Sequence, residues 1–338
     1  MEEHIPLISL TALEENSLDF QPKQFNDYLG QTELKRKLEL YTQAALLRNE
    51  PLDHLLLFGP PGLGKTTLAQ IMASVMNVGI KICSGPMLER TGDAVALLSS
   101  LDPKDILFID EIHRMPTAVE EVLYSAMEQF RVDVIIGQGA GAKSVNLPIH
   151  PFTLVGATTK SGLISAPLRT RFGIIERLDF YPPEDLQLII EQNARYLKIP
   201  FAPQASLIIA QASRGTPRVA KKLVRRVRDF AQVKGKDFID EVVIQEALSF
   251  LGIDVHGLSL VDHRIIQTIF EKFNGGPVGL ETLAALIGED PQTIEEVYEP
   301  FLMREGYIEK TSRGRQIPAH RLQKMQLNKN GQKNIFSA

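Results

Sequence analysis

The chain has no tryptophan and only one cysteine, Cys83, among its 338 residues. A single cysteine cannot close an intramolecular disulfide, so a disulfide-stapled fold is excluded and a reducing compartment is favoured. No stretch reaches the roughly 20 consecutive apolar residues that a membrane-spanning helix needs. The start, Met-Glu-Glu-His, lacks the basic segment of a signal peptide, and we therefore expect a cytoplasmic protein.

Missing motifs and the small net charge also argue against several classes of protein. Seven histidines are scattered without an HExxH motif, which gives a zinc hydrolase no support, and Cys83 has no evident base near it in sequence. The net charge of −4 argues against a surface that coats nucleic acid, so any DNA contact must be local. With 44% apolar and 23% charged residues, the chain is typical of a globular protein of two or three domains.

A complete phosphate-binding loop occupies residues 59–66, Gly-Pro-Pro-Gly-Leu-Gly-Lys-Thr. It follows the apolar run 54–58 and precedes a helix-compatible segment, which is the strand-loop-helix setting that the motif requires. Glycines allow backbone N–H groups to approach phosphates, and a helix N-terminus adds partial positive charge. We expect Lys65 to reach the β- and γ-phosphates of a nucleotide and Thr66 to bind Mg²⁺.

Two further apolar runs end in polar residues suited to the same site. Residues 105–109 precede Asp110 and Glu111, as expected of a buried parallel strand whose carboxyl end meets the nucleotide. Asp110 would hold Mg²⁺ and Glu111 would polarise the attacking water. The run 152–158 ends at Thr159, which could contact the γ-phosphate, although a plain β-branched strand end is the alternative.

Two arginines are candidates for stabilising charge on a transferred phosphoryl group. Arg171 follows the third run, and a cation there could act on a neighbouring subunit. Arg218 begins the basic, amphipathic segment 218–228, for which we predict a helix whose other charges form a solvated face. Only Arg218 in that segment is predicted to sense the nucleotide.

The order of patterns predicts three domains. Residues 1–183 alternate strands and helices and predict an α/β P-loop core with a parallel sheet. Residues 184–256 have helical periodicity and predict a small all-α lid, and residues 257–338 predict a winged-helix domain. Within the core, alternating apolar and polar residues on both sides of a glycine-rich turn predict a β-hairpin at about 131–149, which could also be an ordinary sheet edge.

The winged-helix domain is the predicted DNA-binding part. A helix-turn-helix pattern at 280–303 precedes a hairpin in which basic residues outnumber acidic ones. Basic wings suit phosphate contacts, which give affinity without sequence specificity, whereas a wing that contacts protein is the alternative. The basic residues of the hairpin itself are Lys310, Arg313 and Arg315.

Several strings together resemble the RuvB family, bacterial branch-migration motors of the AAA+ class, from about residue 18 to 320. They are GPPGLGKTTLA (59–69), FIDEIHRM (108–115), FTLVGATT (152–159), PLRTRFG (167–173), RGTPRVA (214–220) and GGPVGLETLA (275–284). The resemblance implies an ATP- and Mg²⁺-dependent helicase-type motor that forms a homo-hexamer on duplex DNA at Holliday junctions, in DNA recombination and repair. It also implies RuvA as a partner at the 131–149 hairpin, and RuvC in the resolving complex.

Residue roles carried over from the family extend the predicted site. For nucleotide binding they are Phe20, Gln21, Gly62, Leu63, Gly64, Lys65, Thr66, Thr67, Glu128, Gln129, Phe130, Arg171, Tyr181 and Arg218, and for DNA binding they are Lys310 and Arg315. Gln21, Gln129 and Lys310 depart from the usual family pattern, and a lysine cannot form the bidentate contact of an arginine. These departures put adenine affinity and part of the wing contact in doubt.

Two other functions remain open at this point. A clamp-loader or origin-binding ATPase would also join such a core to a third domain. A nucleotide-switched adaptor would bind DNA or protein without turnover, but Glu111 argues against it, because a switch does not need to position a lytic water.

Overall fold

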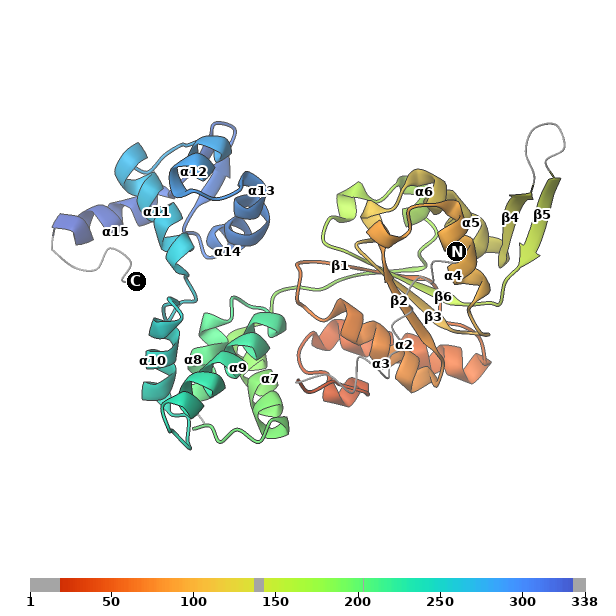
Figure 1. The fold of residues 1–338 in the computed structure, drawn as a ribbon, viewed down its shortest axis with the longest axis horizontal. Coiled ribbons are helices and arrows are strands. Elements are labelled where there is room, and N and C mark those ends of the chain that lie inside the picture. The colour runs from red at the N-terminus through yellow and green to blue at the C-terminus, as the bar shows by residue number, and fades with distance from the viewer. Residues whose placement is uncertain (1–18, 137–142, 203, 331–338) are drawn as a thin grey trace. The chain divides into compact units, whose positions relative to one another are not determined.

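The computed structural model describes residues 19–136, 143–202 and 204–330, and the chain divides into two compact units, Met1–Arg228 and Asp229–Ala338 (Figure 1). The first unit is built on a five-stranded sheet in which every neighbouring pair is parallel. In spatial order its strands are β2 (Ile80–Ser84), β3 (Ile106–Asp110), β6 (Thr153–Thr158), β1 (Leu55–Phe58) and β7 (Ile174–Arg177).

The strand order determines which loops meet. β6 lies between β1 and β3, with Phe58 opposite Thr158 and Ile109 opposite Gly156. The carboxyl ends of these three strands therefore lie side by side at one edge of the sheet. In such sheets the ligand binds outside that edge, so the topology places the three predicted motifs together.

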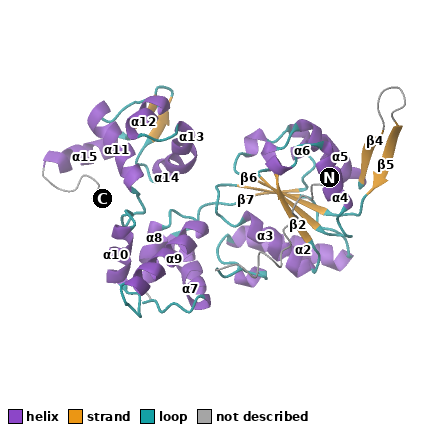
Figure 2. Cartoon of the chain, viewed as in Figure 1, coloured by secondary structure: helices purple, strands orange, loops and turns teal. Residues whose placement is uncertain are grey.

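Helices cover both faces of the sheet, and this explains why its strands are continuous apolar runs rather than alternating ones (Figure 2). α2 (Thr32–Arg48) and α3 (Lys65–Met76) lie on one side, and α4 (Thr91–Ser99) and α5 (Thr117–Gln129) lie on the other. On the latter side, Leu56, Leu107 and Leu154 pack in one buried cluster with side chains of α4 and α5.

An antiparallel hairpin, β4 (Arg131–Ile136) and β5 (Lys143–Pro148), is inserted between α5 and β6 and projects from the rest of the unit (Figure 1). Its base is anchored, because Val132 is buried in the core, while Val145 further along is 42% exposed. The predicted turn at 137–142 lies outside the described residues.

α6 (Ala166–Arg169) lies between β6 and β7 in sequence, and β7 is followed by α7 (Pro183–Tyr196), α8 (Ala205–Ala212), α9 (Pro217–Val233) and α10 (Glu241–Phe250). Along α9, Ala220, Leu223, Val224 and Val227 are buried at helical spacing. The boundary between the two compact units falls inside α9. The domain limits at 183/184 and 256/257 stay predictions.

Besides the end of α9 and α10, the second unit contains helices packed around one core and a short hairpin. α11 (Leu260–Phe273), α12 (Leu280–Ile287) and α15 (Ala319–Asn330) pack with a bent segment made of α13 (Pro291–Thr293), a π-helical turn (Ile294–Tyr298) and α14 (Glu299–Arg304). The hairpin is β8 (Glu309–Thr311) and β9 (Gly314–Gln316), joined to the core by the bridge between Val278 and Arg315. The predicted fold class, a P-loop core with a helical lid and a winged helix, is confirmed. Across the described ranges, no helix is both long and apolar enough to span a membrane.

Candidate active site and nucleic-acid interface

The loop between β1 and α3 has a backbone that only glycine accommodates at three positions. Gly59, Gly62 and Gly64 have φ of 142°, 79° and 100°. A Cβ would lie 2.3 Å from the Leu178 carbonyl oxygen at Gly59, 2.9 Å from Arg218 Cβ at Gly62, and 2.8 Å from the Tyr28 hydroxyl at Gly64. The loop is therefore closely wrapped by neighbouring residues, and its bare backbone forms the cradle that a phosphate chain requires.

Two buried tyrosines support this loop from behind. The Tyr28 and Tyr181 hydroxyls lie 2.8 Å apart, and each lies 3.2 Å from the carbonyl oxygen of Leu63. Burial raises the pKa of Tyr181 to about 12 and that of Tyr28 well above its usual value, so both remain protonated donors. Leu63 and Tyr181, predicted to bind nucleotide, thus hold the loop in shape and do not line the pocket.

Lys65, at the start of α3, folds back over the loop. Its Nζ donates to the carbonyl oxygens of Gly59 (2.8 Å) and Pro60 (2.9 Å). Burial lowers the pKa of Lys65 to about 8; Asp110 opposes that shift and Arg218 adds to it. The ammonium is thus poorly solvated, and an anion beside it would stabilise its charged form.

The two acids after β3 have different geometries. Asp110 Oδ1 accepts a hydrogen bond from the Glu111 N–H at 3.0 Å, and Glu111 takes a left-handed backbone conformation with φ of 47°. Its carboxylate pairs with Arg114 at 2.8 Å. A non-glycine residue in this region is unusual and turns the chain sharply, so that both acids line the same pocket.

The end of β6 supplies the third side of the site. Thr158 Oγ1 accepts the Lys160 N–H at 2.9 Å and lies 2.9 Å from His113 Nδ1. These contacts fix the turn in which Thr159 reaches the pocket. Burial lowers the pKa of His113, with Lys160 and Arg114 acting in the same direction against the nearby acids.

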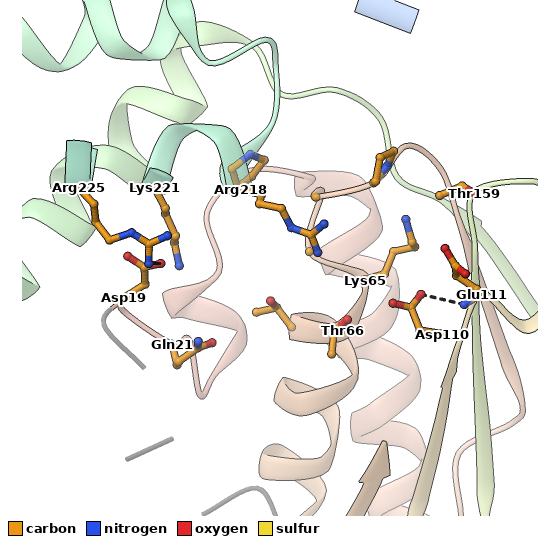
Figure 3. Close-up of a pocket in the computed structure, with 15 residues that line it drawn as sticks. Asp19, Gln21, Lys65, Thr66, Asp110, Glu111, Thr159, Arg218, Lys221 and Arg225 are labelled. Carbon is orange, nitrogen blue, oxygen red and sulfur yellow. Dashed lines mark hydrogen bonds and ion pairs between the residues drawn. The ribbon is translucent and has the colours of Figure 1, made fainter. Parts of the chain in front are cut away.

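The phosphate-binding loop, the two acids, Thr159 and the first turns of α9 line a pocket of about 320 Å³ (Figure 3). The predicted residues that it brings together are Gln21, Gly62, Gly64, Lys65, Thr66, Thr67, Asp110, Glu111, Thr159 and Arg218. Lys65, Asp110 and Glu111 face one another at one end, and Arg218 points toward them from the N-terminal end of α9. The arrangement combines cations and a backbone cradle for phosphates with two carboxylates, one of which can orient a water.

Three charged residues of the pocket were not predicted. Asp19, Lys221 and Arg225 line its other end. Arg225 pairs with Asp19 at 2.8 Å, and Lys221 Nζ donates to the Phe20 carbonyl oxygen at 2.7 Å. Burial lowers the pKa of Lys221. Positions 218, 221 and 225 share one helix face, so α9 lines the pocket with two cations besides Arg218. That only Arg218 senses the nucleotide stays a prediction.

The segment before the core is attached to the lid through these contacts. The Phe20 N–H donates to Asn193 Oδ1 of α7 at 2.9 Å, and Asn193 Nδ2 donates to Asp19 at 3.3 Å. The Phe20 ring packs edge-on against Tyr196, with centroids 5.8 Å apart. Phe20 therefore shapes this end of the site through its backbone and its packing and is not among the lining residues.

The donor set fits a magnesium nucleotide. Thr66 and Asp110 offer a hydroxyl and a carboxylate beside the cradle. Mg²⁺ is usually held by one or two carboxylates together with phosphate oxygens, and does not need a cage of protein ligands. No cluster of three or more His, Cys, Asp or Glu that could hold a metal occurs in the part of the chain that the structure describes.

Besides Phe20, Leu63 and Tyr181, four predicted nucleotide-binding residues lie outside this pocket. Glu128 and Arg171 pair with each other at 3.1 Å, and Phe130 packs edge-on against Phe152 in the core. Gln129 ends α5 beside them. A role for these residues in nucleotide binding stays a prediction.

The three predicted DNA contacts on the wing have different surroundings. Lys310 is exposed and pairs with Glu295 at 2.8 Å, and Arg313 is exposed at the hairpin turn. Arg315 is buried, with its Nε and Nη2 donating to the two carboxylate oxygens of Glu299 at 2.5 and 3.1 Å. Glu299 is fully buried. DNA contact by Arg315 stays a prediction, but its guanidinium already has an internal partner.

The strand order, the loop after β1, the acids after β3 and the helical lid define an AAA+ P-loop ATPase. Family models match in succession: the Holliday junction DNA helicase RuvB P-loop domain at 20–178, the RuvB AAA lid domain at 181–254, and the RuvB C-terminal winged helix domain at 255–325. The chain belongs to the RuvB family.

Individual relatives agree with this assignment. The chain is 53% identical over 300 residues to the Holliday junction branch migration complex subunit RuvB of Christiangramia forsetii, covering 89% of this chain and 88% of that protein. It is 54% identical over 297 residues to the Flavobacterium psychrophilum protein of the same name, covering 88% and 87%. The Thermotoga maritima RuvB Holliday junction branch migration motor superposes with a TM-score of 0.79 at 46% identity, covering 93% of this chain and 98% of that one.

Proposed function

We propose that this protein is a ring-forming ATPase that moves duplex DNA and drives branch migration at four-way junctions. The observation that carries the proposal is the pocket, in which the glycine cradle, Lys65, the two acids and Arg218 converge in one chain that also contains a winged helix. The names of its relatives, branch migration complex subunits, support the same substrate. Neither a clamp loader nor a nucleotide-switched adaptor is favoured.

Each pocket residue has a definite task in this proposal. The bound magnesium nucleotide supplies the γ-phosphoryl group and a metal charge that neutralises its oxygens. Lys65 and the backbone of the loop hold the phosphates, and Thr66 and Asp110 hold the metal. Glu111 and Thr159 orient the attacking water, and Arg218 brings positive charge from the lid.

The position of Arg171 supports the proposal of a ring. Its guanidinium does not line the pocket of its own chain, and it is held instead by α5 and α6. We propose that it serves the γ-phosphate of a neighbouring subunit in a homo-hexamer, with Glu128, Gln129 and Phe130 beside it at the interface. A closed cyclic assembly gives every pocket such a neighbour.

Each proposed partner is assigned to a particular surface of the protein. The wing, with Lys310 and Arg313 exposed, is the proposed contact to DNA phosphates, and the projecting hairpin at 131–149 is the proposed docking site for RuvA. RuvC would join the same junction complex. We propose a cytoplasmic location, because the chromosome of a bacterium lies there and the single thiol suits a reducing compartment.

A synthetic four-way junction tests the activity. The protein with RuvA and ATP should convert the junction to duplex products, whereas Glu111→Gln should hold ATP without turnover and leave the junction intact. Strand displacement or the opening of a circular clamp, in place of branch migration, would contradict the proposal and favour one of the other motors.

Mixed rings test the role of Arg171. Arg171→Ala should bind ATP but lose about 10³–10⁵ of its hydrolysis rate, as when such an arginine is withheld from phosphoryl transfer. Mixing it with Lys65→Ala chains should restore some hydrolysis, because those chains cannot hold phosphates but still supply Arg171. In a pool that is half Arg171→Ala, roughly 2% of random hexamers are wholly wild-type, so a steep loss of translocation is expected. Activity that falls in simple proportion to the mutant fraction would mean that each subunit completes its own site.

A further inference from the structure

Arg171 is held by three different contacts. Its guanidinium carbon lies 4.6 Å from the centroid of the Tyr124 ring, Nη1 donates to the Pro167 carbonyl oxygen at 2.7 Å, and Nε lies 3.1 Å from Glu128 Oε1. Tyr124 and Glu128 are four residues apart on α5, so they present one face of that helix to the arginine. The aromatic ring supports the flat guanidinium, the hydrogen bond to the Pro167 carbonyl oxygen sets its rotation, and Glu128 adds a charge contact in which Nε makes no hydrogen bond.

The Tyr124 ring is itself held in place through its hydroxyl. Its hydroxyl donates to Glu120 Oε2 at 2.8 Å, and the Ser165 hydroxyl donates to the same oxygen at 2.6 Å. Glu120 is only 6% exposed, so this carboxylate is a buried anchor shared by the two hydroxyls. One carboxylate therefore connects α5 to the residue that precedes α6.

The same serine organises the segment that carries Arg171. Ser165 is the N-cap of α6 and accepts the Leu168 N–H at 3.4 Å. α6 supplies the Pro167 carbonyl that binds Arg171, and Arg171 lies two residues beyond its end. Glu120, Tyr124 and Ser165 thus fix both the platform under the arginine and the helix before it.

We infer that Tyr124 is a positioning residue for Arg171, and that its ring, kept in place by Glu120 and Ser165, holds the guanidinium ready for the pocket of the next subunit. A cation over an aromatic face is attracted to it and keeps its donors free at the edges. The long arginine side chain would otherwise sample many rotamers. A guanidinium that is already positioned does not have to be ordered when the reaction takes place. The inference rests on the proposed role of Arg171.

Tyr124→Leu tests the platform. Leucine favours helix and preserves apolar contact but has no π face. In the full-length protein with junction DNA and RuvA, we expect kcat for ATP hydrolysis to fall at least tenfold, with KM for ATP within about twofold of wild type, since the chain's own pocket is untouched. Tyr124→Phe is the matched control: it keeps the ring over the guanidinium but loses the hydroxyl that anchors the ring to Glu120, so kcat should fall less than in Tyr124→Leu and stay within about threefold of wild type.

Mixing distinguishes positioning from structural damage. Tyr124→Leu chains mixed with Lys65→Ala chains should recover hydrolysis, because the latter supply a correctly held Arg171 to intact pockets. No recovery, or a Tyr124→Phe protein as impaired as Tyr124→Leu, would overturn the inference. If Tyr124→Leu fails to bind a non-hydrolysable ATP analogue, Tyr124→Met provides the same comparison with a flexible side chain.

Arg171→Ala separates the proposed role of Arg171 from the role of Tyr124. An Arg171→Ala protein with undiminished kcat would remove the proposed role of Arg171 and with it this inference. An impaired Arg171→Ala protein beside a Tyr124→Leu protein of wild-type kcat would leave the role of Arg171 standing and refute only the platform.

Discussion

Replacing Arg315 by alanine should destabilise the wing more than it removes a DNA contact. Arg315 makes two hydrogen bonds to Glu299, at 2.5 and 3.1 Å, and Glu299 is 0% exposed. Without the guanidinium, the carboxylate stays buried with its main charge partner gone, and such a loss typically costs about 3–5 kcal/mol. Because a domain of this size is stable by only about 5–15 kcal/mol, that cost removes a large part of its stability and should make opening of the wing far more frequent.

Hydrogen exchange on the full-length chain measures this directly. In Arg315→Ala, amides of 299–317 should exchange much faster than in wild type, and duplex binding should fall with them. Lys310→Ala is the matched control, because its pair with Glu295 is half-exposed on both sides and such pairs are worth only about 0–1 kcal/mol. Its exchange should stay near wild type, while its affinity for duplex falls and becomes less dependent on salt.

A double replacement separates the two roles of Arg315. Arg315→Met combined with Glu299→Leu removes both charges and should restore protection, since apolar residues often replace a buried ion pair without loss of stability. If this protein regains protection and binds duplex with the wild-type salt slope, Arg315 is a structural residue. Restored protection with a salt slope lower by about one unit would make Arg315 a phosphate contact and refute the reasoning. Unchanged exchange in Arg315→Ala would refute the stability argument.

Three further outcomes are expected. Gln21→Arg should tighten binding of a non-hydrolysable ATP analogue, by about 1.5–3 kcal/mol at most, in calorimetric titration; no gain would mean that the cations of α9 already suffice. Asp19→Ala should raise KM for ATP several-fold with little change in kcat, because Arg225 then no longer holds this segment at the pocket; a fall in kcat alone would contradict this. The Nδ1 of His54 accepts an N–H of β6, and burial lowers the pKa of this imidazole in the folded protein. The stability that His54 contributes should therefore be lost as the pH falls from its unfolded-state pKa of about 6.5 through its lower folded-state pKa. Urea midpoints between pH 7 and 5 should fall less in His54→Asn than in wild type, whereas exposed His150→Asn should follow wild type.

The strands of the core were predictable because parallel strands covered on both faces are unbroken apolar runs. Residues 106–109 and 153–158 are fully buried along their length. A parallel strand that is covered on both faces explains such an apolar run between turn residues. Their order was not predictable in the same way. That β6 lies between β1 and β3 depends on pairings between residues about 100 and about 50 positions apart, and it is this order that brings Thr159 to Lys65 and Glu111.

The phosphate end of the pocket was predicted well because its chemistry is local. Gly62, Gly64 and Lys65 belong to one loop, and their roles follow from backbone geometry and charge within eight residues. The opposite end is assembled from three separate segments. Lys221 and Arg225 look like the solvated face of a basic helix until Asp19 and the Phe20 carbonyl, two hundred positions earlier, are placed against them.

The wing shows why counting charges in the sequence does not separate a DNA contact from a structural ion pair. Pro300 has no N–H to give to the carbonyl of residue 296 and its ring crowds that carbonyl, so the helix widens and the Glu299 N–H bonds to Ile294, five residues back. Glu299, at the end of this wider turn, lies among the buried side chains of α14, opposite Arg315. In sequence Arg315 resembles Lys310 and Arg313, but only Arg315 has a buried carboxylate to neutralise. The distinction between a DNA contact and a structural ion pair therefore depends on one acid sixteen residues away, which local patterns of charge do not reveal.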